Sequence, residues 1–560
     1  MSSYDRLDGR TQNVFVKDDE IRVLESRYGR TRNMLAVVSG IVICVIIIIL
    51  LPYFFAASYV KYDEPNVGGL YSNLYDMITS DDGAGAPNST IYGAAIQSWQ
   101  LDTSREYHLS RFGKWNSDVP PTTREYNFTI SEVEDTYPAG VKKTMTLING
   151  KFPGPLIQAN EGDRIIINFL NNASTSSALH FHGLHQNGTN YMDGAEGITQ
   201  CGIAPGKSFT YNFTLDNIWG TYWYHSHYST QYLEGVFGPV VIHSKKEDEK
   251  YKDLYDEEMV ILLSDLYFEN SYDLIQSYIA PDVENAEPIP DSGLIQGKNY
   301  FDCTRLEPSG NYSCKNTSDY AIIPVLEDKT YRLRIISAGG FSEFDFSIDN
   351  HILQVVEADG VNTEPLPIEA LRLANAQRYS VLVTMNQTSV SAGHWLRASM
   401  NTHCYDGENP HLDPELRAIL SYPEMTRLTI ANDGVPPSLP ETPKSHQLDG
   451  TVKCLELNET LLIPSFPLVA PEPDTLIHLD ASFMIGAHQI SLGYFNSSTY
   501  KKHASNYSTL NEIYNSIDRG QISQIFSDSS VTPEWANGDM VVTIDKPMVV
   551  DLLINNYDDG

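Results

Sequence analysis

The sequence has few basic residues and few cysteines. Its 560 residues include 38 Lys and Arg against 72 Asp and Glu, which gives a formal net charge of −34. Nucleic acid is therefore excluded as an expected partner, because binding to phosphates depends on Lys and Arg. Hydrophobic residues make up 41% of the chain, which is typical of folded proteins. The length predicts roughly three to four domains.

Long hydrophobic runs are also rare, and one of them decides the expected topology. The run from Met34 to Ala57 contains no charged residue, and a membrane-spanning helix needs about 20 apolar residues. The charged residues before it are Arg6, Arg10, Lys17, Arg22, Arg27, Arg30 and Arg32, and those just after it are Lys61, Asp63 and Glu64. The more cationic flank stays in the cytosol. We therefore predict a cytosolic tail at 1–33, a signal-anchor transmembrane helix at 34–58 and a type II membrane protein.

The remainder of such a chain is lumenal or extracellular, in the secretory pathway or at the plasma membrane. Glycosylation sequons agree with this side, since none precedes the helix. They lie at Asn88, Asn127, Asn172, Asn187, Asn212, Asn311, Asn316, Asn386, Asn458, Asn496 and Asn506. The six cysteines are Cys44, Cys201, Cys303, Cys314, Cys404 and Cys454. Cys44 lies in the predicted helix; the other five are in an oxidising compartment, and their odd number leaves one without a partner in the chain.

The lumenal part is predicted to be all-β. Short β-branched and aromatic runs such as Lys143–Ile148, Arg164–Leu170 and Tyr331–Ile336 are divided by Gly, Pro and Asn turns, which is typical of β-sandwiches. These runs form three blocks. We predict a stalk at 59–120, domains at 121–246 and 247–430, a linker at 431–474, and a third block at 475–560.

Two histidine pairs stand out. They are His180-Phe181-His182 and His225-Ser226-His227, each inside a strand-like segment. Residues i and i+2 of a strand project from the same face, so two neighbouring strands would bring four imidazoles into one small volume. Imidazole suits Cu, Zn, Fe and Ni. A structural zinc module is one alternative, although such sites usually combine Cys with His.

The motifs around these pairs resemble the first cupredoxin domain of fungal multicopper oxidases. The resemblance includes His180–Thr189, Met192-Asp193-Gly194, Thr199-Gln200-Cys201, Pro205-Gly206 and Gly220–His227, and it continues more weakly through Gly293–Lys298 and Ala376–Tyr379. It implies tandem cupredoxin-like Greek-key β-sandwiches, two complete and a third incomplete. The family couples one-electron oxidation of Fe(II) or phenols to the reduction of O2 to water.

The resemblance also implies roles for individual residues. His180 would ligate a type 2 copper, whereas His182, His225 and His227 would ligate the type 3 pair of the trinuclear cluster. Asp193 matches a carboxylate that delivers protons to oxygen, although an ordinary Asp-Gly turn is the alternative. Neighbouring His185 is expected to be structural and not a ligand.

The third-domain motifs of the family, His-Pro-x-His-x-His and His-Cys-His, do not occur in these residues. The ligands of the type 1 copper and half of those of the trinuclear cluster are thus absent. Ile554–Gly560 resembles the residues just before the first motif. The resemblance therefore implies a truncated gene model or fragment of an oxidase. The alternative is a catalytically inactive, membrane-anchored, cupredoxin-like glycoprotein. Cys201 matches a cysteine that pairs with the family's C-terminal tail, which leaves Cys303–Cys314 and Cys404–Cys454 as expected pairs.

The reductant is the least determined feature. Ala286–Pro290 resembles the segment of yeast iron-uptake ferroxidases that carries an iron-binding glutamate, here Glu287, and Asp558 stands where a second such carboxylate lies. Carboxylates suit a hard cation. Laccase-like relatives can share these segments, so ferroxidase is only slightly favoured over phenol oxidation. An iron permease is a further expected partner of an iron-uptake oxidase.

Overall fold

The structure is a computed structural model. It describes residues 106–110, 114–281, 287–306, 312–315, 320–387, 393–405, 407–423, 426, 429, 439–440, 457–485, 491–496, 498–500, 507–518, 542, 544 and 546–557. The predicted transmembrane helix at 34–58 lies outside these residues. Among the helices that the structure describes, none is both long enough and apolar enough to cross a membrane. The all-β prediction is confirmed for the described residues, which are mostly strand with few helices.

The first block is a sandwich of two four-stranded sheets. One sheet has the order β2-β1-β4-β6, and the other β3-β8-β7-β5. The strands are β1 (Thr123–Thr136), β2 (Lys143–Ile148), β3 (Ile157–Asn160), β4 (Arg164–Asn171), β5 (Leu179–His182), β6 (Ser208–Thr214), β7 (Gly220–Ser226) and β8 (Phe237–His243). Strand β4 is an example of this arrangement. Ile165, Ile167 and Phe169 alternate with more exposed neighbours and are buried in the core between the sheets.

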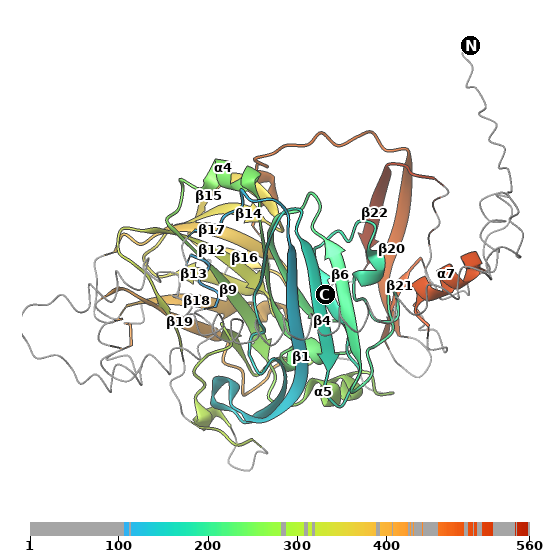
Figure 1. The fold of residues 1–560 in the computed structure, drawn as a ribbon. Coiled ribbons are helices and arrows are strands. Elements are labelled where there is room, and N and C mark those ends of the chain that lie inside the picture. Colours follow the sequence, from blue (N-terminus) through green and yellow to red (C-terminus); the bar gives the residue numbers. More distant parts are fainter. Residues whose placement is uncertain are drawn as a thin grey trace, which may run out of the picture. The chain divides into compact units, whose positions relative to one another are not determined.

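The second block has a six-stranded sheet, β10-β9-β12-β17-β14-β15, and a five-stranded sheet, β11-β19-β18-β13-β16. In Figure 1, β12, β17 and β14 lie side by side. The strands are β9 (Glu257–Leu266), β10 (Ser292–Ile295), β11 (Ala321–Pro324), β12 (Thr330–Ser337), β13 (Phe344–Ile348), β14 (Leu353–Ala358), β15 (Val361–Ile368), β16 (Leu371–Leu373), β17 (Arg378–Thr384), β18 (His394–Met400) and β19 (Glu415–Ser421).

The third block is a small sheet with the order β21-β20-β22. Its strands are β20 (Thr475–Ile485), β21 (Ser491–Phe495) and β22 (Val550–Asn556). The α-helices are α4 (Lys245–Tyr251), α5 (Ser271–Tyr278) and α7 (Thr509–Asp518). Short 3-10 helices are η2 (Pro138–Gly140), η3 (Asn190–Met192), η4 (Gln231–Glu234), η5 (Cys303–Arg305), η6 (Thr402–Cys404) and η7 (Glu459–Leu461). Several large apolar side chains of the sheet β21-β20-β22 are exposed, including Phe483 of β20 and Leu552 of β22.

A hydrophobic cluster joins the first two blocks. Trp223 of β7 packs in this cluster with Val260 and Leu262 of β9 and with Ile336 of β12. Tyr107 and Leu109 belong to the same cluster and are buried. The strand that carries His225 is therefore packed directly against the second block.

Parts of the two predicted connecting segments form hydrogen bonds with the second block. Residues 106–110 fall in the predicted stalk, yet the backbone N–H of Leu109 donates to Glu258 at 2.9 Å and that of Val260 donates to Tyr107 at 2.9 Å. Ile463 falls in the predicted linker, yet its carbonyl accepts a hydrogen bond of 2.8 Å from the backbone N–H of Glu364 on β15. Residues 107–109 bond β9 beyond the stretch that pairs with β10, and Ile463 bonds the edge strand β15. Composition does not reveal such nonlocal hydrogen bonds.

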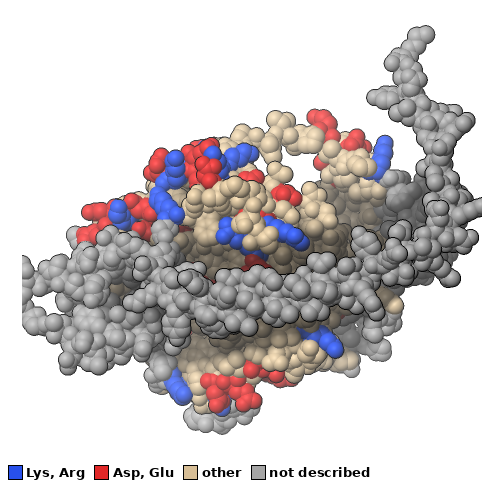
Figure 2. All heavy atoms as spheres, in the orientation of Figure 1, with Lys and Arg blue, Asp and Glu red and all other residues tan. Residues whose placement is uncertain are grey.

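Charged side chains on the described surface are mixed in sign. Figure 2 shows red and blue side chains in small, interleaved groups on the visible face. Exposed ion pairs include Lys245 with Asp118 at 2.8 Å and Lys329 with Asp256 at 3.0 Å. Such surface pairs contribute little to stability, typically about 0–1 kcal/mol each.

Candidate metal centre

The two histidine pairs meet on one face of a sheet. β5 and β7 are antiparallel neighbours in which His180 is directly opposite His225. The N–H of His227 continues this ladder by donating to the carbonyl of Ala178 at 2.9 Å. The period-two prediction of the strand face is thus realised, because His182 lies two residues after His180 and His227 two residues after His225.

The four rings form a compact group. The ring centroid of His180 lies 5.7 Å from that of His182, 5.3 Å from that of His225 and 5.5 Å from that of His227. One ligand nitrogen each from His180, His182 and His225 fits within 4.8 Å of the others. His225 is buried, His180 and His182 are half-buried, and His227 is exposed. The group is therefore enclosed on one side and reachable from the other.

Hydrogen bonds select which ring nitrogens face the centre. Nδ1 of His180 lies 2.7 Å from the carbonyl of Asp193, and Nδ1 of His225 lies 3.0 Å from the carbonyl of Ser226. Each Nδ1–H donates to its carbonyl, which leaves Nε2 as the free lone pair, an arrangement found around metal-ligating histidines. Nε2 of His225 is buried and has no hydrogen-bond partner among the described residues. A buried imidazole nitrogen without a partner fits a metal ligand well.

The surroundings favour the neutral form of three of these imidazoles, those of His182, His225 and His227. Burial lowers the pKa of His182 to about 4, with further lowering by Arg378 and His180. Burial also lowers the pKa of His225 well below its ordinary value. The His227 side chain is exposed at its outer side, and partial desolvation by the neighbouring groups, followed by the effect of His180, lowers its pKa. Neutral imidazole is the form that binds metals, so His182, His225 and His227 are ready to coordinate at pH 7.

A tight loop presents Asp193 to His180. Oδ1 of Asp193 lies 3.3 Å from Nδ1 of His180, and the Asp193 side chain is 27% exposed. Gly194 follows with φ of +84°, and a Cβ there would lie 1.9 Å from the carbonyl oxygen of Leu179. Only glycine fits this approach. The carbonyl that fixes the His180 ring is therefore held in place by close backbone packing.

Trp223 is a neighbour that the sequence prediction missed. Its ring stacks on His225 with centroids 4.2 Å apart and on His182 with centroids 5.3 Å apart. Tyr232 lies on another side of His225, with ring centroids 5.4 Å apart. Trp223 precedes His225 by two residues, so the same period-two rule could have placed it on the histidine face.

The other predicted site residues lie elsewhere. Glu287 is exposed, and the Tyr278 hydroxyl donates to its carboxylate at 3.4 Å. Asp558 lies outside the described residues. His185 is exposed and does not belong to the three-histidine group.

The structure places a disulfide between Cys303 and Cys314, the pair expected from the resemblance. The Cys404 side chain and Cys454 are outside what the structure describes, so the Cys404–Cys454 pair stays a prediction.

Six of the predicted glycosylation sites are exposed, namely Asn127, Asn172, Asn187, Asn386, Asn458 and Asn496. Asn212 is half-buried, and Arg164 donates to its side chain at 2.8 Å. Asn88, Asn311, Asn316 and Asn506 lie outside the described residues.

Comparison with known proteins gives this geometry a family. Models described as multicopper oxidase match residues 126–247 and residues 257–424. Laccase-1 of Cryptococcus neoformans var. neoformans is 34% identical over 438 residues, which cover 76% of this chain and 67% of that relative. The chain belongs to the multicopper oxidase family. Members of this family are copper-dependent oxidoreductases.

Relatives of this multicopper oxidase chain carry two kinds of name. The iron transport multicopper oxidase FET3 of Gibberella zeae is 32% identical, over 78% of this chain and 62% of that relative. The crystal structure of Fet3p, described as a multicopper oxidase that functions in iron import, matches with a TM-score of 0.63 and 30% identity, over 78% of this chain and 74% of that one. The crystal structure of a laccase from Botrytis aclada matches with a TM-score of 0.58 and 28% identity, over 73% of this chain and 71% of that one. Both names therefore occur among proteins of similar sequence and fold.

Proposed function

We propose that His180, His182, His225 and His227 hold copper ions that take part in the reduction of O2. The single observation that carries this proposal is the convergence of the four rings, one of which, His225, has a buried Nε2 without a hydrogen-bond partner. Imidazole nitrogen is a suitable copper donor. Copper bound there would supply one-electron transfer to oxygen. Third-domain ligands, which the family resemblance implies, are required in addition for oxidase activity.

The chain's own residues would prepare the site in two ways. The Asp193 carbonyl orients the His180 ring through Nδ1, while the Asp193 carboxylate, partly exposed, is placed to pass protons between solvent and the site. The Trp223 ring and the hydrophobic cluster that joins the first two blocks exclude water from the side of His225. Excluding water strengthens electrostatic interactions inside such a site.

We propose Fe(II) as the reductant, slightly ahead of a phenol. Four Fe(II) ions would each give one electron, and one O2 with four protons would become two waters. Support comes from the exposed carboxylate of Glu287 and from the iron-transport names of two relatives. The laccase names of other relatives support a phenolic reductant equally directly. Attachment by a helix at 34–58, a lumenal or extracellular site, glycosylation and an iron permease partner are further parts of this proposal.

Copper binding tests the first part. The metal-free 560-residue chain is titrated with copper, and bound metal is measured after dialysis for the wild type, for the His180→Ala/His225→Ala variant and for His185→Ala. We expect the double variant to lose affinity by about 100-fold or more, since removing even an outer partner of a ligand costs 10–100-fold. His185→Ala is the matched control, because His185 is exposed and outside the group. Equal affinity of the double variant and the wild type would refute the proposal.

Oxygen consumption tests the second part. Because the third-domain ligands are required for oxidase activity, the assay uses a copper-loaded protein that also carries the family's third-domain motifs. This protein is supplied with Fe(II) or with a phenol, and O2 uptake is followed with an electrode. Faster uptake with Fe(II) supports the ferroxidase proposal, whereas faster uptake with the phenol supports a laccase. Copper binding without O2 uptake from either reductant supports the inactive glycoprotein instead.

A further inference from the structure

Strand β7 extends beyond its neighbour β5. The last pair between the two strands joins His182 to Trp223, because Gly183 turns the chain away with φ of +85°. Thr221 and Tyr222 still pair with β8 on the other side. The edge of β7 that faced β5 is therefore open at Thr221, only four residues before His225.

Two side chains of the second block bind this open edge. The N–H of Thr221 donates to Oε1 of Glu357 at 2.6 Å, and its carbonyl accepts from Nε of Arg378 at 3.1 Å. The N–H and C=O of one strand residue point to the same side, so this pair supplies the bonds that a neighbouring strand would make. Glu357 lies on β14, and Arg378 is the first residue of β17. We call Glu357 and Arg378 the Thr221 clasp.

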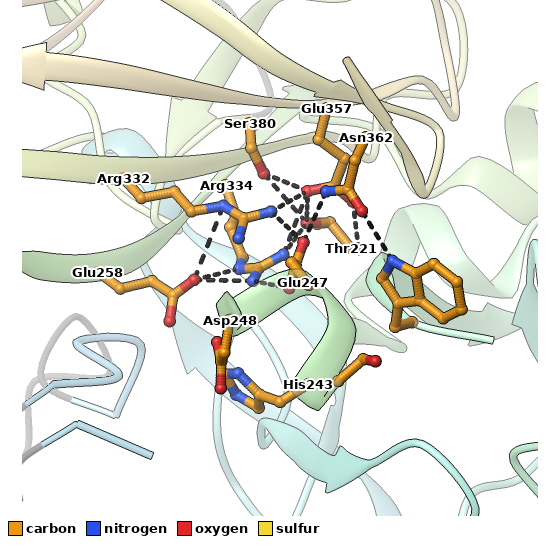
Figure 3. A network of polar contacts seen from close by, with 12 residues as sticks. Thr221, His243, Glu247, Asp248, Glu258, Arg332, Arg334, Glu357, Asn362 and Ser380 are labelled. Atoms are coloured by element: carbon orange, nitrogen blue, oxygen red, sulfur yellow. Dashed lines mark hydrogen bonds and ion pairs between the residues drawn. The ribbon is translucent and has the colours of Figure 1, made fainter. Parts of the chain in front are cut away.

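The Glu357 half of the clasp is fixed by a fully buried network. Its Oε2 accepts from the Thr221 hydroxyl at 2.9 Å, from Arg332 at 2.8 Å and from Arg334 at 3.1 Å. Figure 3 shows Glu357 and Thr221 together with both arginines and with Ser380, whose hydroxyl also donates to Glu357. Glu357 has no exposed surface. A buried carboxylate with this many donors has little freedom to move.

The Arg378 half lies against the histidine strands. Its guanidinium pairs with Asp359 at 2.8 Å and lies 5.4 Å from the ring centre of Tyr222. A Cβ on Gly183 would lie 2.7 Å from Nη2 of Arg378, so the guanidinium fills the space next to the residue after His182. Arg378 therefore contacts the turn that ends β5 and the start of β7 at once.

We propose that Glu357 and Arg378 are positioning residues for the metal-binding histidines, and that docking of the second block sets the alignment of His182 with His225. The clasp restricts both sliding of β7 along its axis and rotation about that axis. The reason is that both backbone hydrogen bonds of Thr221 are made with side chains anchored in the second block. The inference rests on the proposed function only in treating these histidines as ligands. Neither clasp residue touches the metal position itself.

Amide hydrogen exchange of the metal-free full chain tests the clasp directly. The variants are Arg378→Met, which removes the guanidinium, and Arg378→Lys, which keeps the charge. In Arg378→Met we expect exchange in Tyr222–Ser226 to be about tenfold faster, as for the loss of one charged hydrogen bond. Exchange in β4 stays unchanged and shows that the first block remains folded. The exchange rate of Tyr222–Ser226 in Arg378→Lys should lie between the rates in Arg378→Met and in the wild type.

Arg397→Met is the matched control. Arg397 is another buried arginine of the second block, and it binds Asp349 through two hydrogen bonds of 2.8 Å and 3.0 Å. This control should leave exchange in β7 unchanged. Unchanged exchange in Arg378→Met, or equal acceleration in Arg397→Met, would overturn the proposal.

Cobalt binding separates positioning from general stability. The chain is titrated with Co2+, whose visible absorption reports the ligand geometry. We expect Arg378→Met to lower the affinity ten- to one hundredfold, in the range for outer partners of metal ligands, while Arg397→Met changes nothing. Faster exchange with unchanged cobalt affinity would overturn a positioning role. If the wild-type chain binds neither cobalt nor copper, the proposed function fails. The exchange result still decides whether the clasp holds β7.

Discussion

The indole ring of Trp223 lies almost flat on the imidazole of His225, with centroids 4.2 Å apart and an angle of 28° between the planes. Both residues are on β7 and on the same face of the strand. A metal bound by His225 would therefore lie close to the Trp223 ring. This contact gives an optical signal for the metal centre.

Copper should quench the fluorescence of the wild-type chain mainly through Trp223. In Trp223→Phe, which keeps an aromatic ring in the hydrophobic cluster that joins the first two blocks, most of the copper-dependent quenching should disappear. Trp395→Phe is the control, since Trp395 is also buried but lies on β18 of the second block. Fluorescence titration with copper measures the difference. Equal quenching in wild type and Trp223→Phe would place the metal away from His225.

Gly194→Ala should disrupt the metal centre through the backbone. The added Cβ would lie 1.9 Å from the carbonyl oxygen of Leu179, directly before His180, and backbone cannot move aside as a side chain can. Gly188→Ala is a matched control, because Gly188 also has a positive φ, +74°, but open space around its Cβ position. The control should cost only the backbone strain, about 1 kcal/mol.

Thermal unfolding and copper titration measure both variants. Gly194→Ala should lose copper affinity and lower the unfolding temperature by clearly more than Gly188→Ala does. If the two variants behave alike, strain from positive φ alone explains the effect, and close packing of the Asp193 loop against β5 has no role in holding His180.

Glu287→Gln should weaken the use of Fe(II) but not of a phenol. The carboxylate is exposed, so one surface ion contact is lost, which predicts an increase of about two- to fivefold in KM for Fe(II). Asp273→Asn is the control, since it removes one negative charge from exposed α5. The measurement is steady-state kinetics, with each reductant, of a copper-loaded protein that also carries the family's third-domain motifs. An equal change in the KM for Fe(II) and in the KM for the phenol would show that Glu287 has no specific role in binding iron.

His243 should make stability depend on pH. Burial lowers its pKa to about 4, and its ring stacks on Trp115 while Nε2 accepts from the Gln158 amide at 2.9 Å. The unfolded chain has the ordinary pKa of about 6.5. Between pH 6.5 and 4 the unfolded state binds the extra proton, so stability falls as pH falls, by about 1.4 kcal/mol per pH unit. Above pH 6.5 this contribution is complete.

Urea unfolding at pH 7, 6 and 5 checks this dependence. His243→Gln has no imidazole to protonate, so its free energy of unfolding should fall less steeply between pH 6.5 and 5 than that of the wild type. His185→Gln, at an exposed position, serves as the control and should keep the wild-type slope. A His243→Gln slope equal to that of the wild type would contradict burial of a neutral His243.

Much of the metal centre could be predicted from short-range pattern. The spacing of His180 with His182 and of His225 with His227 places each pair on one strand face, whatever the rest of the chain does. The pairing of β5 with β7 then brings the pairs together, with His180 opposite His225. The same reasoning extends to Trp223, which lies two residues before His225 on the same strand face.

Other features depended on contacts between residues far apart in the chain. Tyr107 and Leu109 lie in a segment with stalk-like composition, yet they are buried against β9. They bond backbone groups of Glu258 and Val260, which β10 does not pair. Glu357 and Arg378 bind Thr221 from more than a hundred positions away. No local pattern records such partners, since their cause is the docking of two folded blocks.

By itself the sequence determined the β-rich class, the paired histidines on common strand faces and the resemblance to multicopper oxidases. These follow from alternation and from short motifs, which depend on neighbours along the chain. Only the tertiary structure decided which ring nitrogens face the centre, which aromatic ring covers His225 and which side chains hold the open edge of β7. Those features arise from hydrogen-bond satisfaction and close packing between elements, and both are defined only once the chain is folded.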